Sequence, residues 1–230
     1  MISLYNINRQ MIFKGLFVLM ICLFNLWIYQ IYRFNFFFGE LLVIETFLLF
    51  LSLYIKNRII PILIWIIFLV LSFSLLINHF DKNAFSIATV ESIRIEERKQ
   101  FYANEMGKIY RNRIGILYFD TLRLYSNKIS NNFFSALDLG LYFSPNSLIE
   151  NEKYPLFLAP FFVIGFLVLL VTANKTISIV YFLLALFQNS FINLDSKFGP
   201  LLIFPFISLC IALGLIRFIK IVKLKYKKLI

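Results

Sequence analysis

The stretch IIPILIWIIFLVLSFSLLIN, residues 59–78, carries no charged side chain and is long enough to cross a lipid bilayer as a helix. A crossing helix needs about 20 mostly apolar residues, because it must cover about 30 Å of hydrocarbon. Five other stretches approach this length and character: residues 15–32, 36–55, 155–173, 176–193 and 200–218. The sequence therefore predicts an all-α fold, a polytopic membrane helix bundle with about six transmembrane helices in a 3+3 arrangement.

The composition supports this prediction. Hydrophobic residues make up 60% of the 230 residues, and the mean hydropathy is +0.82, whereas an ordinary soluble domain is about 45–50% apolar. The apolar residues form long runs towards the two ends of the chain, and the middle has ordinary polarity. We expect an N-terminal membrane segment of three helices (1–79), a helical extracytoplasmic loop (80–154), and a C-terminal membrane segment of three helices with a basic tail (155–230).

The basic residues predict the orientation in the membrane. The net charge is +11, but residues 80–154 hold nearly equal numbers of basic and acidic side chains, so the excess belongs to the membrane segments and their flanks. This distribution argues against a nucleic-acid partner and identifies the lipid bilayer as the surroundings. Basic residues collect on the cytoplasmic side of membrane proteins. With the N-terminus inside, the cytoplasmic residues are Arg9, Lys14, Lys56, Arg58, Lys175, Arg217, Lys220, Lys223, Lys225, Lys227 and Lys228.

Only Arg33 and Lys197 then fall on the short outer loops. The sequence therefore predicts a multi-pass protein of the cell membrane, with both termini cytoplasmic and the loop 80–154 outside. Residues 15–32 follow two basic residues, as in a secretory signal, but the apolar run is long and lacks a small-residue cleavage site, so we expect an uncleaved anchor.

Prolines mark the expected starts of two helices. Pro155 and Pro200 suit the first helical position, where a missing N–H costs nothing. Pro160 and Pro205 follow about one turn later, and we expect them to kink their helices.

The middle loop is expected to contain two helices. Residues 91–110 are highly charged, whereas residues 114–137 place apolar and aromatic side chains on one helical face. That face is formed by Ile114, Tyr118, Leu122, Tyr125, Ile129 and Phe133. It must pack against the first loop helix, the membrane surface or a partner. We expect a protein partner at this aromatic face of the 114–143 segment.

Glu45 is the sharpest candidate for a functional residue, because it lies inside the apolar run LLVIETF, residues 41–47. An acid within the membrane is costly and is by default a candidate for a proton carrier, an ion ligand or the partner of a cation. Alternatively, the second span begins near Glu45, which would then lie at the outer interface beside Glu40, a second candidate acid.

His79 and Asp81 meet at the outer end of the third span, where they suit either proton transfer or an ordinary solvated boundary. The loop residues Arg94 and Arg98 can hold an anionic headgroup, although acidic residues nearby balance them. The tail after the last span is either an anionic-lipid contact or a simple cytoplasmic anchor. It contains Lys220, Lys223, Lys225, Lys227 and Lys228.

Motifs for metals, cofactors or covalent catalysis are missing from the sequence. Cys22 and Cys210 each lie in an apolar run, and no metal-ligand spacing occurs around them. We therefore expect no metal, no cofactor and two cysteines that serve as small apolar residues.

The second half of the chain resembles a known class of enzymes. NNFFSALDLGLYFSPN (131–146) precedes YPLFLAPFFVIGFLVLL (154–170), and YFLLALFQNSFINLDSKFGPLLIFPFISLCIALGL (181–215) follows a short basic turn. This arrangement, roughly residues 127–218, is similar to the C-terminal part of bacterial protein O-mannosyltransferase-like membrane glycosyltransferases. The resemblance implies work with lipid-linked sugars. Those enzymes have about twice as many spans and a catalytic acid in their first outer loop, where this chain has only Glu40.

Three functions are compatible with the sequence. The first is a non-catalytic structural or accessory membrane component, which the absence of a reactive motif favours. The second is a truncated or divergent glycosyltransferase-like protein. The third is a small transporter that uses Glu45. The sequence leans against an enzyme without excluding one.

Overall fold

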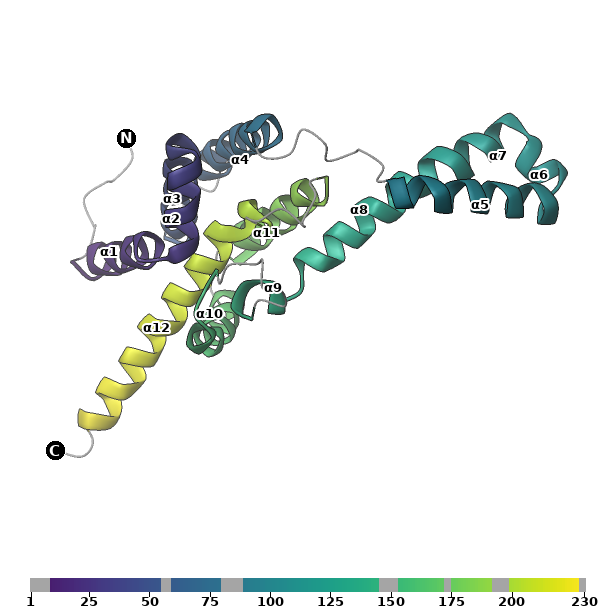
Figure 1. The fold of residues 1–230 in the computed structure, drawn as a ribbon. Coiled ribbons are helices and arrows are strands. Elements are labelled where there is room, and N and C mark those ends of the chain that lie inside the picture. The colour runs from purple at the N-terminus through teal and green to yellow at the C-terminus, as the bar shows by residue number, and fades with distance from the viewer. Residues whose placement is uncertain are drawn as a thin grey trace.

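The computed structural model describes residues 9–54, 59–79, 89–144, 153–171, 175–191 and 199–227. Throughout these ranges the regular secondary structure is helical, which confirms the all-α fold. Figure 1 shows a bundle formed by the two ends of the chain and a long helical arm that extends sideways from it. The bundle contains the candidate functional acid, and the arm contains most of the charged loop.

The first half of the bundle is formed by α1 (Arg9–Leu23), α2 (Leu26–Phe34), α3 (Phe36–Ser52) and α4 (Ile59–His79). The prediction of one continuous helix over residues 15–32 is wrong, because α1 and α2 meet at a 65° bend. At the bend, Asn25 Oδ1 accepts a hydrogen bond of 2.8 Å from the Trp27 amide and so begins a new helix. Asn35 caps α3 in the same way.

The second half of the bundle contains α10 (Ala159–Val171), α11 (Lys175–Ser190) and α12 (Phe204–Lys227), with a 3₁₀ turn before α10 and another before α12. The predicted kinks at Pro160 and Pro205 stay predictions. Because α10 begins at Ala159 and α12 at Phe204, each proline lies in the first helical turn, where its missing N–H leaves no hydrogen bond unmade.

The first part of α12 is the centre of the bundle, and α1, α3 and α10 pack around it. Residues 201–213 are buried without interruption. Two glycines let α10 and α12 touch through their backbones. A Cβ atom on Gly165 would lie 1.7 Å from the Cys210 carbonyl oxygen, and one on Gly214 would lie 1.9 Å from that of Phe161. Close contact between small residues is the usual way in which helices pack in membranes.

Large apolar side chains also cover the outside of the bundle. Phe24 is 86% exposed and Val171 is 87% exposed, and α4 exposes Leu63, Ile67 and Val70 on its outer side. Soluble monomers rarely show such extended apolar surface.

One helix among the described residues, Leu201–Lys223, is long and apolar enough to cross a membrane. A second crossing is obtained if the bent pair α1 and α2 counts as one broken span. Three shorter apolar helices accompany them: Ile62–Leu75, Leu156–Val171 and Thr176–Ser190.

The arm is a helical hairpin made of α5 (Thr89–Glu105), α6 (Lys108–Arg111), α7 (Arg113–Leu117), a π-helical turn (Tyr118–Leu122) and α8 (Arg123–Ala136). Aromatic rings join its two sides: the rings of Tyr102 and Phe119 have their centres 4.7 Å apart. Arg123 donates a hydrogen bond to the Tyr102 hydroxyl. Tyr110 donates one of 2.8 Å to Asp120. Burial, followed by this bond, raises the pKa of Tyr110.

The predicted aromatic face of the second loop helix does not pack on the first in its outer part. Ile114, Tyr118 and Leu122 are all exposed, and the side that faces α5 carries Phe119 instead. The reason is that α5 contacts the ring of Phe119, one residue after Tyr118, so the predicted face that includes Tyr118 stays exposed. Of the three predicted packing alternatives, the membrane surface and a protein partner remain for this exposed face.

Candidate functional site

Glu45 is fully buried near the middle of α3, at the point where α3, α4 and α11 meet. Ser72, on α4, donates a hydrogen bond of 2.5 Å to its Oε1 atom. Tyr181, on α11, donates one of 2.9 Å to its Oε2 atom. The carboxyl group therefore connects helices from both halves of the chain. In the sequence, the arm lies between these two halves.

Local helix geometry explains why the acid points inwards. Residues three and four apart lie on one face of a helix, and Leu42, Glu45, Thr46 and Leu49 form such a face on α3, all buried. The helix α3 begins at Phe36, well before Glu45, and the alternative in which the membrane span begins near Glu45 stays a prediction. Glu45 is thus an interior residue of its helix.

Further polar groups lie on the helices that surround this carboxyl. The Tyr181 hydroxyl is also 3.2 Å from the Leu202 carbonyl oxygen, in the turn that precedes α12. The ring of Trp65 meets the ring of Tyr181 edge-on at 5.6 Å. The Trp65 Nε1 and Ser178 Oγ atoms are buried and have no hydrogen-bond partner among the described residues. This part of the core therefore carries more hydrogen-bonding groups than its internal bonds use.

The arrangement has two chemical capacities. Two hydroxyl donors satisfy a buried acid and fix the relative positions of three helices, which is a structural role. The same acid, held in an apolar interior, is also the kind of group that binds and releases a proton or a cation during transport.

The other candidate residues lie apart from this centre. Glu40 is exposed on α3, near Tyr32. The backbone of His79 ends α4, but its side chain and the whole of Asp81 lie outside the described residues, so this pair stays a prediction. Arg94 and Arg98 are exposed on α5, on the arm.

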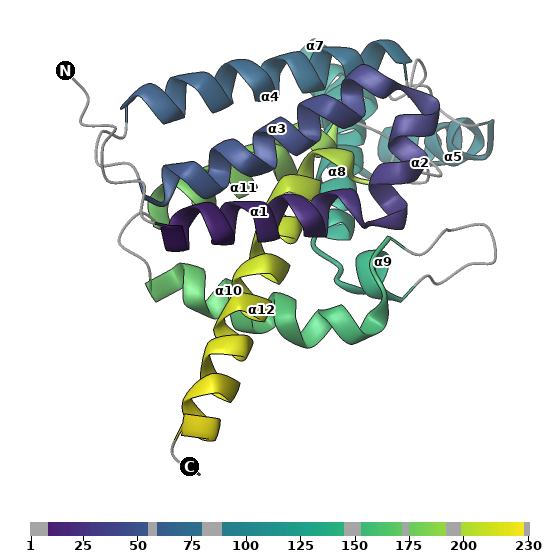
Figure 2. The ribbon, with the colours of Figure 1, turned by 90° about the vertical axis from the view of Figure 1, so that its left-hand side faces the viewer.

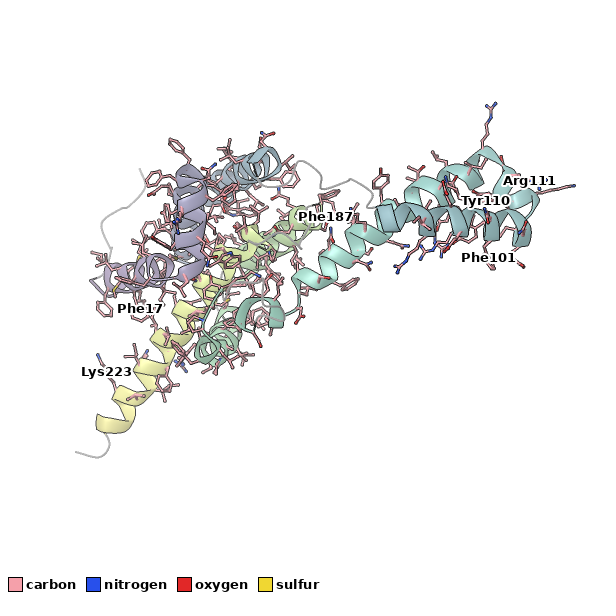
Figure 3. The ribbon with its side chains drawn as sticks, viewed as in Figure 1. Phe17, Phe101, Tyr110, Arg111, Phe187 and Lys223 are labelled. Atoms are coloured by element: carbon pink, nitrogen blue, oxygen red, sulfur yellow. The ribbon has the colours of Figure 1, made fainter. Side chains whose placement is uncertain are left out.

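The basic tail is described in part. Lys220 and Lys223 are exposed near the end of α12, where Figure 3 shows Lys223. Lys225 and Lys227 are described in their backbone alone, and Lys228 lies outside the described residues. Their contact with anionic lipid stays a prediction.

A buried cation that sequence reasoning missed lies where the arm returns to the bundle. Lys153 is 4% exposed, and its Nζ atom donates a hydrogen bond of 2.9 Å to the Leu141 carbonyl oxygen. The same atom lies 5.9 Å from the ring centres of Trp27 and Tyr142, within the reach of a cation–π interaction. The sequence offered one signal for this buried cation: Lys153 is a basic residue at the outer end of a predicted span, directly before Tyr154-Pro155.

Comparison with known proteins identifies no relative: no family model, no curated protein and no solved structure matches the chain. The resemblance of residues 127–218 to membrane glycosyltransferases therefore stays a prediction.

Proposed function

We propose that the chain is a multi-pass integral membrane protein of a structural or accessory kind, which crosses the bilayer six times and holds the arm at the outer surface. The observation that carries this proposal is the apolar outside of the bundle. Phe24, Leu63, Ile67 and Val171 are exposed there, and a hydrocarbon environment removes the cost of exposing them to water.

The order of the helix ends supports the proposed topology. Figure 2 shows α1, α3, α4 and α10 lying along similar axes, with α1 and α4 running opposite to α3 and α10. The first residue of α1, the last of α3, the first of α4 and the last of α10 lie at one end of the bundle, on the left of that view. The short helices α2 and α9 (Gly140–Phe143) lie at the other end. This alternation fits crossings by these four helices on either side of one outer loop, whereas α12 runs crosswise to them in the same view.

The accessory role is supported by the arm. Its two sides are held together by their own aromatic contacts, and it exposes Ile114, Tyr118 and Leu122. Side chains of this kind suit attachment to another surface. A protein partner at the 114–143 face stays a prediction beside this proposal.

The first test is the strength of membrane attachment. Expressed in a bacterial host, the full chain should stay with the membranes after washing in alkaline carbonate and should float with lipid in a density gradient, because several apolar helices lie in the hydrocarbon. A peripheral membrane protein of the same host serves as the control that is released. Release of this chain by the alkaline wash would contradict the proposal.

A second candidate function is a small transporter, which the burial of Glu45 between helices of both halves favours. In liposomes that contain the purified protein and a trapped pH-sensitive dye, this function predicts proton movement under an imposed membrane potential. Glu45→Gln should abolish it, because an amide cannot release a proton, and Glu40→Gln, which changes an exposed acid on the same helix, should preserve it. Equal fluxes for wild type and Glu45→Gln would exclude this candidate.

A further inference from the structure

We infer that the tip of the arm, residues 106–118, lies on the outer surface of the bilayer and binds anionic lipid headgroups. This inference rests on the proposed membrane location of the bundle. It assigns one ligand, an anionic lipid surface, to a part of the chain for which the sequence left a membrane surface and a protein partner open.

The first observation is the side-chain chemistry of the tip. Its basic residues are Lys108, Arg111 and Arg113, and no acidic residue occurs between Glu105 and Asp120. On α5, acids accompany the basic residues, and Lys99 lies 3.5 Å from Asp120. The tip thus carries three basic residues and no acid of its own, whereas residues 121–137, which also lack acids, carry Arg123 and Lys128 alone.

The second observation is the apolar surface among these charges. Ile109 is 72% exposed and Ile114 is 74% exposed, and Leu117 is exposed as well. Ile109 and Ile114 also line one shallow groove together with Lys108 and Tyr118. Large apolar side chains interleaved with basic ones are typical of segments that lie in the interface of a membrane.

The backbone holds these residues in place. A Cβ atom on Gly115 would lie 2.2 Å from the Ile109 carbonyl oxygen, so only glycine lets α7 fold back this closely on α6. Gly107, with φ of 50°, allows the preceding turn. The turn therefore holds Ile109 and Ile114 close to each other on the surface of the tip.

The third observation is the direction of the arm. It extends sideways in Figure 1, whereas Figure 2, turned by 90°, shows α1, α3 and α4 lengthwise. Like α12, the arm therefore runs crosswise to α1, α3 and α4. If these helices cross the bilayer, the arm runs along the membrane plane, with α5 towards the end of the bundle that carries α2 and α9. Figure 3 shows Arg111 at its far end.

Charge and direction together favour lipid over a protein partner. A basic residue near an anionic membrane surface contributes about 1 kcal/mol, roughly a fivefold change in binding. The tip offers three such residues beside apolar side chains that the interface can accept, and the membrane that holds the bundle lies within its reach.

Hydrogen–deuterium exchange of the full chain in lipid nanodiscs tests this inference. One set of discs contains phosphatidylcholine alone, and the other also contains phosphatidylglycerol. We expect the backbone amides of residues 106–118 to exchange about tenfold more slowly in the anionic discs. Arg111→Glu should remove most of this difference. The matched control Arg94→Glu, which makes the same charge change nearer the base of the arm, should retain it.

Ile109→Ser combined with Ile114→Ser provides a second test, since both side chains are exposed and their loss leaves the packing of the arm intact. This variant should lose protection in both kinds of disc. Equal exchange of the wild-type tip in neutral and anionic discs would overturn the inference, as would equal effects of Arg94→Glu and Arg111→Glu. Protection that requires an added protein and not lipid would overturn it in favour of a protein partner. Incorporation of the protein into the discs is measured on the same sample. A protein that enters the discs without protection of the tip contradicts this inference alone, whereas a protein that does not enter them contradicts the proposed membrane location.

Discussion

Replacing Gly165 with alanine is expected to destabilise the bundle by about 2–3 kcal/mol, the upper part of the usual cost of overpacking a core. The added Cβ would lie 1.7 Å from the Cys210 carbonyl oxygen, and backbone atoms cannot move aside as a flexible side chain can. The helices α10 and α12 would have to separate, and α12 is the element around which the bundle is built. Gly214→Ala should act alike, and thermal unfolding of the purified protein in detergent measures both effects.

Gly140→Ala is the matched control. Its new Cβ would meet only the exposed Asp138 side chain, whose Oδ1 atom lies 3.1 Å away and accepts a hydrogen bond from the Gly140 amide. We expect its stability to stay within about 0.5 kcal/mol of wild type, as for most substitutions outside a core. If Gly165→Ala were as stable as Gly140→Ala, the close contact between α10 and α12 would be contradicted.

Replacing Glu45 with alanine is expected to cost about 2–4 kcal/mol of stability. The change removes two hydrogen bonds between helices and leaves a cavity in the core. Ser72 and Tyr181 each keep a nearby backbone carbonyl, Phe68 for the former and Leu202 for the latter, which limits the loss. Unfolding in detergent is again the measurement.

The variant Glu45→Gln distinguishes the contribution of the hydrogen bonds to stability from that of the acidic group. The amide can accept from one hydroxyl and donate to the other, so we expect a loss below about 1 kcal/mol. Tyr181→Phe removes a single hydroxyl and should lie between the two Glu45 variants. A result in which alanine and glutamine are equally damaging would contradict the bonding between α3, α4 and α11.

The sequence predicted the positions of the bundle helices well because uninterrupted apolar runs determine them. The expected spans 36–55 and 59–78 correspond to α3 (Phe36–Ser52) and α4 (Ile59–His79). The bend at Asn25 was missed because one polar residue hardly changes the hydropathy of a window, although its side chain caps a new helix. At this position the capping hydrogen bond of Asn25 ends one helix and begins another, although the apolar run continues through it.

The contacts of the candidate site were beyond sequence reasoning. Glu45 itself was found, because an acid in an apolar run is conspicuous. Its partner Tyr181 lies 136 residues away in the chain, and nothing in either segment indicates that they meet. The same holds for Gly165 and Gly214, whose contact depends on how α10 crosses α12.

The central claim is the multi-pass topology, and accessibility from the two sides of the membrane tests it most directly. The native cysteines Cys22 and Cys210 are buried, so a single new cysteine on an exposed residue can be labelled selectively. We chose Asn131, on the arm, and Lys223, near the end of α12, both exposed. In intact bacterial cells, a membrane-impermeant maleimide should label Asn131→Cys at once and Lys223→Cys only after the membrane is opened. Labelling of both from outside, or of Lys223→Cys alone, would contradict the account.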